Sequence, residues 1–330
     1  FSPTRRHTRF GFKSRGLGDV YKRQALNLIR DLRMGEQPSD LRFLPDGQVL
    51  LAAGTQGTGI KDVSLANGVV RMVVEAVSPG GQVLSKDDKA ELYRVFETIW
   101  SQLYGIRVAL YRNEGEIGDG GELAIVTLIE SDRPAELLNS IPDLVKFAND
   151  GMRSMTDEGI EPVVSFEYLM EHEVMDGRRV DILRIDTSNT NPVHRQRLTR
   201  FFGVSAGTVR FIAHDRHVVM FVGTNSTLLK SAISNLTSGA PGLAKHPAIL
   251  SSSGKIDPRR TIELHFSARN FNYIYSAAIR GRRDMGRYVR PNEITSIGLI
   301  MAEDRFGFDL WVPMNELDRA TKLMMALDNF

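Results

Sequence analysis

Residues 209–236 constrain the fold of this chain more than any other stretch, because they predict two antiparallel strands followed directly by a helix. Apolar side chains alternate along residues 209–213, and the polar run at residues 214–216 can form a tight turn. Residues 217–222 are almost continuously apolar, which is typical of a strand covered on both faces. We therefore expect a β-hairpin that packs beneath other elements of the chain.

The helix predicted after this hairpin is amphipathic. Thr224 or Asn225 can cap its first turn, because a short oxygen-bearing side chain accepts hydrogen bonds from the unpaired amides there. Its apolar positions fall on one face and comprise Leu228, Leu229, Ala232, Ile233 and Leu236. The pattern predicts a hairpin with a covering helix, and we expect Val219 and Phe221 to lie beneath that helix.

The same order of elements recurs elsewhere in the chain. Residues 123–138, 217–232 and 306–323 each read as an apolar strand, a short polar cap and a helix with paired apolar positions. Tight hairpins join antiparallel strands, and each helix must cover a sheet to bury its apolar face. The sequence therefore predicts an α+β fold of repeated antiparallel β-hairpin plus helix units, with sheets layered with helices. We expect two such modules, at residues 81–205 and 206–330.

Local signals place the other elements of these modules. A helix is expected over residues 85–105, with Gly105 as its end, and strands over residues 106–112 and 122–130. A third hairpin is expected around Met175-Asp176-Gly177, because Asp-Gly is a strong signal for a two-residue turn. The succession over residues 100–330 resembles uncharacterised bacterial envelope-associated proteins built of repeated hairpin and helix units. That resemblance implies a non-catalytic protein of unknown role, and we expect a binding or structural module. The compartment is left open, with a periplasmic or secreted location as one alternative.

Residues 25–80 give a less regular pattern. Residues 40–68 contain a strand, the turn Pro45-Asp46-Gly47, a second strand and a glycine-rich turn, which together resemble one blade of a WD-repeat propeller. Lys61-Asp62 stands where that family usually has Trp-Asp, and no second copy follows. The alternative is an edge hairpin or an irregular lead-in to the first module.

Residues 1–24 differ in composition from the rest of the chain. The string Gly16 to Gln24 resembles the translation of sequencing-adapter read-through found at the ends of reading frames assembled from environmental DNA. We expect a non-native or disordered tail, with the true N-terminus missing, and the alternative is a natural basic tail. Seven basic residues and one acidic residue give this segment +6, so the remainder of a chain of net charge +2 carries −4. The basic pI therefore gives no reason to expect specific nucleic-acid binding.

Composition excludes several kinds of site. With 330 residues and 42% hydrophobic side chains, the chain can bury one large core or two ordinary ones. The absence of cysteine excludes disulfides, thiolate metal sites and a cysteine nucleophile. No apolar run is long enough to predict a transmembrane segment, and His214 and His217 flank a turn without a completing ligand set. We expect no cofactor and no bound metal.

One motif suggests catalysis. Residues 203–207 match the Gly-x-Ser-x-Gly pattern of serine hydrolases, with Ser205 as the nucleophile and with Asp215 and His217 following in the hydrolase order. That elbow needs a strand before the serine and a helix after it, whereas a strand is predicted after Ser205. A serine hydrolase is therefore the alternative to a binding module, and a small-residue turn explains the same motif.

The strongest charged feature is a cluster of arginines in residues 280–290. Five arginines and one aspartate give it a local charge of +4, and the arginines are Arg280, Arg282, Arg283, Arg287 and Arg290. Guanidinium groups bind carboxylate, phosphate or sulfate through paired hydrogen bonds. The sequence therefore predicts an exposed loop that binds an anionic polymer, a lipid surface or an acidic protein. The alternative is a solvated loop whose arginines pair with acidic neighbours.

Overall fold

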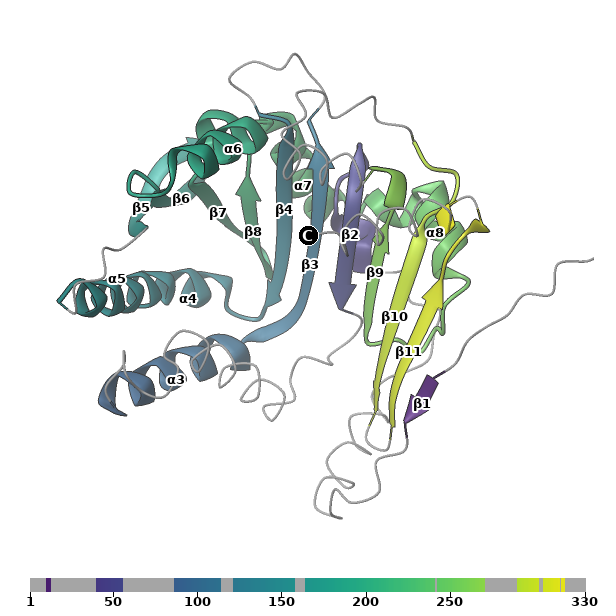
Figure 1. The fold of residues 1–330 in the computed structure, drawn as a ribbon, viewed down its shortest axis with the longest axis horizontal. Coiled ribbons are helices and arrows are strands. Elements are labelled where there is room, and N and C mark those ends of the chain that lie inside the picture. The colour runs from purple at the N-terminus through teal and green to yellow at the C-terminus, as the bar shows by residue number, and fades with distance from the viewer. Residues whose placement is uncertain are drawn as a thin grey trace, which may run out of the picture. The chain divides into compact units, whose positions relative to one another are not determined.

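The computed structural model confirms the predicted mixed α+β class. It describes residues 10–12, 40–55, 86–113, 121–157, 164–240, 242–270, 290–302, 305–314, 316 and 317. Within these ranges, ten strands pair antiparallel through hairpins, six α-helices pack against them, and a three-residue strand adds at one edge (Figure 1). The described residues divide into two compact units.

The first unit draws on residues 1–57, 107–112 and 237–330. Its strands follow the order β1-β11-β10-β9-β2-β3. Their bounds are Phe10–Phe12 (β1), Val49–Thr55 (β2), Ile262–Phe266 (β9), Thr295–Ala302 (β10) and Arg305–Trp311 (β11), and β3 (Leu103–Arg112) enters this unit at Arg107. The helices of this unit are the 3-10 turns η1 (Asp40–Phe43) and η5 (Gly242–Lys245) and the α-helix α8 (Pro247–Ser253).

The second unit draws on residues 58–106 and 113–236. Its strands follow the order β4-β8-β7-β6-β5, with bounds Leu123–Ser131 (β4), Ser165–Met175 (β5), Arg178–Asp186 (β6), Thr208–His214 (β7) and His217–Val222 (β8). The helices are α3 (Lys86–Ser101), α4 (Pro134–Asn139), α5 (Ile141–Asp157), α6 (Pro192–Phe202), η4 (Gly203–Ser205) and α7 (Ser226–Ser238), which ends at the boundary of the unit.

Two predicted hairpins form as the turn chemistry requires. Asp176 and Gly177 between β5 and β6 have φ values of 49° and 77°, which is the pair of positive angles that a type I′ turn needs. Asp215, between β7 and β8, has a φ of 49°. The register of β7 with β8 runs from Val209 opposite Val222 to His214 opposite His217. Residues 209–222 therefore form the hairpin that the sequence predicted.

Some boundaries differ from the prediction. Gly105 does not end a helix, because α3 stops at Ser101 and Gly105 is a buried residue inside β3. From Leu103 onward, buried and half-buried residues alternate along β3, as expected for a strand, whose successive side chains point to opposite faces. The helix predicted after Arg133 is divided at Ser140 into α4 and α5. Residues 205 and 206 both belong to the second unit, and the division into modules at residues 81–205 and 206–330 stays a prediction.

Residues 25–80 contribute an interior strand where an edge hairpin or propeller blade was expected. β2 pairs antiparallel with β3 on one side and with β9 on the other. Its sequence, VLLAAGT, contains no charge and no proline, so both of its edges can donate and accept ladder hydrogen bonds. A strand from the beginning of the chain is thereby placed between strands from later segments.

The predicted tail has one described segment. Residues Phe10–Phe12 pair antiparallel with Phe306–Phe308 of β11, and the other residues of 1–24 lie outside the described ranges. That residues 1–24 are dispensable stays a prediction. The helix predicted at the end of the 306–323 segment also falls largely outside the described residues.

Candidate functional site

The two faces of the second unit's sheet are buried to different extents. On β4, Ala124, Val126 and Leu128 are completely buried, whereas the alternate side chains of Ile125 and Ile129 are only half-buried. Successive side chains of a strand point to opposite faces, so one face is closed and the other is partly open. The residues of β8 show the same difference in burial between the two faces.

On β8, Val219 and Phe221 are 0% and 2% exposed, and the alternate residues Met220 and Val222 are half-buried. Helix α7 lies on the far side of these strands in the view of Figure 1, and its apolar face is also buried, through Leu228, Leu229, Ala232 and Ile233. The closed face is therefore the one that carries Val219 and Phe221.

Helix α4 covers one end of the partly open face. Leu137 and Leu138 of α4 are buried in one cluster with Phe211 of β7 and Val218 of β8. Helix α5 continues from α4 toward β5, where the side-chain amide of Asn149 donates to the carbonyl of Phe166 and accepts from its amide. These contacts cover the end of the sheet at which β7 runs into its turn with β8.

Helix α6 lies at the opposite end of the same strands. Arg200 near its C-terminus donates from Nε to Glu122 Oε1 over 3.0 Å, just before β4 begins. The chain after α6 passes so close to Gly121 that a Cβ on that residue would lie 2.2 Å from the amide nitrogen of Gly203. Gly121 has a φ of 69°, so glycine is required here both for the backbone angle and for the close approach.

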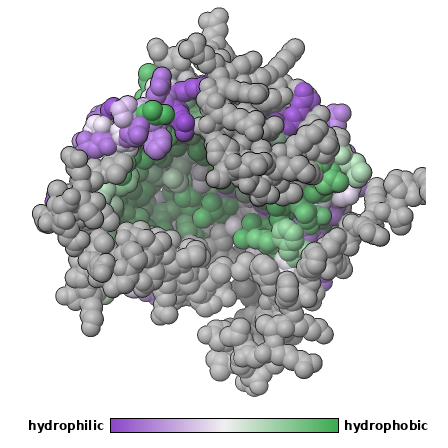
Figure 2. All heavy atoms as spheres, viewed as in Figure 1, coloured by the Kyte–Doolittle hydropathy of each residue, from purple (hydrophilic) through white to green (hydrophobic). Residues whose placement is uncertain are grey.

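Between these helices the partly open face forms an apolar hollow. Figure 2 shows apolar side chains gathered in a recess, beneath a hydrophilic band at the place where Figure 1 shows α6. We name as the apolar hollow five half-buried side chains that pack against the buried cluster of Leu137, Leu138, Phe211 and Val218. They are Ile129, Tyr168, Leu183, Met220 and Val222. They come from β4, β5, β6 and β8, so the hollow extends across the second unit's sheet.

The polar groups at the hollow are already hydrogen-bonded. The hydroxyl of Tyr168 donates to Asp181 Oδ2 over 2.7 Å, and the amide of Glu171 donates to Asp181 Oδ1 over 2.7 Å. Burial, followed by the hydrogen bond to Asp181, raises the pKa of the Tyr168 phenol, so this group stays neutral. The side chains of the hollow therefore offer a ligand mainly hydrocarbon surface and the ring of Tyr168.

Arg197 of α6 differs from the other two arginines of that helix. Arg195 donates to the carbonyl of Ser188 and Arg200 pairs with Glu122, whereas Arg197 makes no hydrogen bond or ion pair with any residue that the structure describes. Arg197 is nonetheless half-buried. It precedes Arg200 by three residues and the buried Phe201 by four, so it lies on the face of α6 that is directed toward the sheet.

The predicted arginine cluster is only partly described. Arg280, Arg282, Arg283 and Arg287 lie outside the described residues. Arg290 forms an ion pair with Asp46 at 3.3 Å, with both side chains more than half exposed. This contact is of the kind that the solvated-loop alternative expects, and anion binding by the cluster stays a prediction.

Ser205, Asp215 and His217 are too far apart to form the catalytic site of a serine hydrolase. Ser205 is buried in η4, immediately before β7, whereas Asp215 and His217 lie at the other end of β7. A seven-residue strand spans about 23 Å at roughly 3.3 Å per residue. Gly203 and Gly207 have positive φ values of 62° and 82°, so the motif shapes a turn between α6 and β7.

A different serine and histidine do meet, in the first unit. His265 Nδ1 lies 2.6 Å from Ser296 Oγ, and His265 Nε2 lies 3.2 Å from Glu263 Oε2. The distances are those of a catalytic triad. All three residues are at most 1% exposed, however, so a substrate cannot reach the serine. No motif in the sequence pointed to this network, although Glu263 and His265 are two residues apart in β9 and so share one face.

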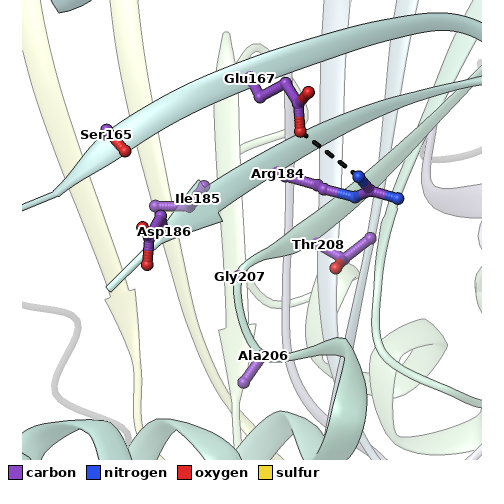
Figure 3. Close-up of a pocket in the computed structure, with 8 residues that line it drawn as sticks. All are labelled: Ser165, Glu167, Arg184, Ile185, Asp186, Ala206, Gly207 and Thr208. Atoms are coloured by element: carbon purple, nitrogen blue, oxygen red, sulfur yellow. Dashed lines mark hydrogen bonds and ion pairs between the residues drawn. The ribbon is translucent and has the colours of Figure 1, made fainter. Parts of the chain in front are cut away.

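A polar cleft also lies at the outer strands of the second unit. It has a volume of about 360 Å³, and Figure 3 shows the ion pair of Glu167 with Arg184, at 3.4 Å, among its lining residues. Glu167 and Arg184 alternate with Tyr168 and Leu183, so they face away from the apolar hollow. Since Asp186 adds a second carboxylate to the one cation, the cleft has no excess positive charge with which to attract an anion.

The comparisons with known proteins identify no relative. No protein-family model matches the chain, and no curated protein or solved structure matches it significantly. Within the described ranges, no three His, Cys, Asp or Glu side chains are grouped so that they could hold a metal ion. No helix among the described residues combines the length and apolar character needed to cross a membrane.

Proposed function

We propose that the protein is a binding module rather than an enzyme, and that its second unit takes up an apolar group in the apolar hollow. The observation that carries this proposal is the difference between the two faces of β4 and β8. Val126 and Val219 on one face are fully buried, whereas Met220 and Val222 on the other are half-buried. Covering half-exposed apolar surface stabilises a complex by roughly 25 cal/mol for each Å² removed from water.

Binding rather than chemistry fits the groups that line the hollow. Four of its five side chains are hydrocarbon or thioether, and the fifth, Tyr168, has its hydroxyl engaged by Asp181. Apolar pockets with few convergent polar groups are typical of sites that bind ligands.

The test is the binding of a neutral solvatochromic dye, followed by its fluorescence. Met220→Asp should weaken dye binding about tenfold or more, because it places a charge where the dye displaces water. Met314→Asp is the matched control, since Met314 is 81% exposed and belongs to the first unit, whereas the hollow belongs to the second. Equal dye affinity in the wild-type protein and both variants would refute the hollow as a binding site.

A further inference from the structure

We propose that the ligand of the apolar hollow is a long-chain carboxylate, with its alkyl chain on the floor of the hollow and its head group at Arg197. The inference rests on the binding function proposed above and adds the chemical class of the ligand. Its basis is Arg197, which has no partner among the described residues and lies on the sheet-facing side of α6, the helix that borders the hollow.

The floor of the hollow favours an alkyl chain. Strands β8 and β7 are each paired on both sides, so their backbone amides and carbonyls are used within the sheet. A polar ligand group placed on these strands would lose its water without gaining a hydrogen bond, which is unfavourable. Only methylene groups can cover Met220 and Val222 without that cost.

The rim favours an anion. Helix α6 has the sequence PVHRQRLTRFF, which contains three arginines and no acidic residue. Two of the arginines are engaged, by Ser188 and by Glu122. Arg197 alone of the three has no partner among the described residues, although it is half-buried on the sheet-facing side of the helix.

A carboxylate complements this arginine in geometry as well as charge. The planar guanidinium can donate two parallel hydrogen bonds to the two carboxylate oxygens, and charge-assisted bonds of this kind are among the strongest in proteins. Burial of the alkyl chain would bring the head group to the rim, where Arg197 is half-exposed to solvent. The anionic head group therefore complements the guanidinium of Arg197, and the alkyl chain complements the apolar side chains of the hollow.

The experiment compares dodecanoate with dodecanol, below the concentrations at which either aggregates, by displacement of the neutral dye from the full chain. Wild-type protein should bind dodecanoate about tenfold or more tightly than dodecanol, which is the ratio expected for a charge-assisted hydrogen bond. Arg197→Gln should abolish that preference and leave dodecanol binding unchanged. Arg195→Gln, at an exposed position of the same helix, should keep it.

The outcomes separate the two proposals. Equal binding of acid and alcohol by the wild-type protein, or a preference for the acid that survives Arg197→Gln, overturns the carboxylate ligand while leaving the hollow as a binding site. Displacement of the dye by neither ligand overturns this inference, and failure of the dye itself to bind overturns the proposed function as well. Thermal unfolding of Arg197→Gln and Arg197→Lys provides the control for folding, and Arg197→Lys should retain part of the preference.

Discussion

Arg260 donates from Nε to Glu263 Oε2 over 2.8 Å, and both side chains are buried in the core of the first unit. The aliphatic stem of Arg260 packs beside Gly298, where a Cβ would lie 3.4 Å from Cβ and Cδ of the arginine, within ordinary van der Waals contact. His265 Nε2 lies 3.2 Å from the same carboxylate oxygen, which makes Glu263 the centre of a buried polar network.

Removal of Glu263 should strongly destabilise the first unit. Glu263→Ala leaves the guanidinium of Arg260 buried without its counter-charge, and breaking a buried pair in this way costs about 3–5 kcal/mol. Glu91→Ala is the matched control, because Glu91 pairs with Arg94 at the same sequence spacing but with 53% of its side chain exposed. Urea unfolding of both variants measures the difference. Equal free energies of unfolding for the two variants would show that the buried pair contributes no more to stability than the exposed one.

Acid should destabilise the first unit in two stages. Burial, together with the charge of Arg290, holds the pKa of His246 below its ordinary value of 6.5. Burial alone would raise the pKa of Glu263, but the hydrogen bonds and charges of His265 and Arg260 hold it below its ordinary value of 4.5. In both cases the unfolded chain binds the proton first as the pH falls. Stability should therefore decline below about pH 6.5 and again below about pH 4.5.

Chemical unfolding at a series of pH values measures this decline. His246→Leu should remove the upper stage, since both ring nitrogens of His246 are buried without a hydrogen-bond partner among the described residues, and leucine gives up no such bond. The lower stage should remain. A pH profile that is identical in His246→Leu and the wild-type protein would contradict the assignment of the upper stage to this histidine.

Adjacent residues of β8 should respond very differently to the same substitution. Val219 is completely buried on the closed face, so Val219→Asp places an unpaired charge in the core and should prevent stable folding. Met220 is half-buried on the open face, so Met220→Asp should reduce the melting temperature only modestly. Soluble expression of Val219→Asp with wild-type stability would show that this face is not part of the core.

The arginine cluster of residues 280–290 can be tested separately from the hollow. In a chain that lacks residues 1–24, retention on heparin and on anionic vesicles should be strong at low salt and fall steeply as salt is added. Arg282→Glu combined with Arg283→Glu should remove it. Equal, salt-insensitive retention of both proteins would exclude anion binding by this loop.

Local features of the fold could be predicted from the sequence, because the determining residues are close together. Asp176-Gly177 fixes one hairpin through its positive φ values, and the alternation along residues 209–213 fixes the inward face of another. The position of β2 could not be predicted, because its partners β3 and β9 are distant in the sequence and its apolar residues suit many neighbours.

The candidate site could not be predicted for a related reason. The residues of the hollow look like ordinary core positions, and only the placement of α4 and α6 at opposite ends of the strands leaves Met220 and Val222 half-exposed. Arg197 likewise has no sequence signal that separates it from Arg195 and Arg200. The difference lies in their contacts, since those two arginines have partners and Arg197 has none among the described residues.

The most direct measurement of the central claim is the methyl NMR spectrum of protein labelled at its methionines, recorded during titration with dodecanoate. The Met220 resonance, assigned through Met220→Leu, should shift progressively and saturate, because its methyl group lies in the apolar hollow. The resonance of Met314, which is 81% exposed in the first unit, should remain in place. An unchanged Met220 resonance at concentrations that displace the dye, or an equal shift of both resonances, would contradict the assignment of the apolar hollow as the binding site.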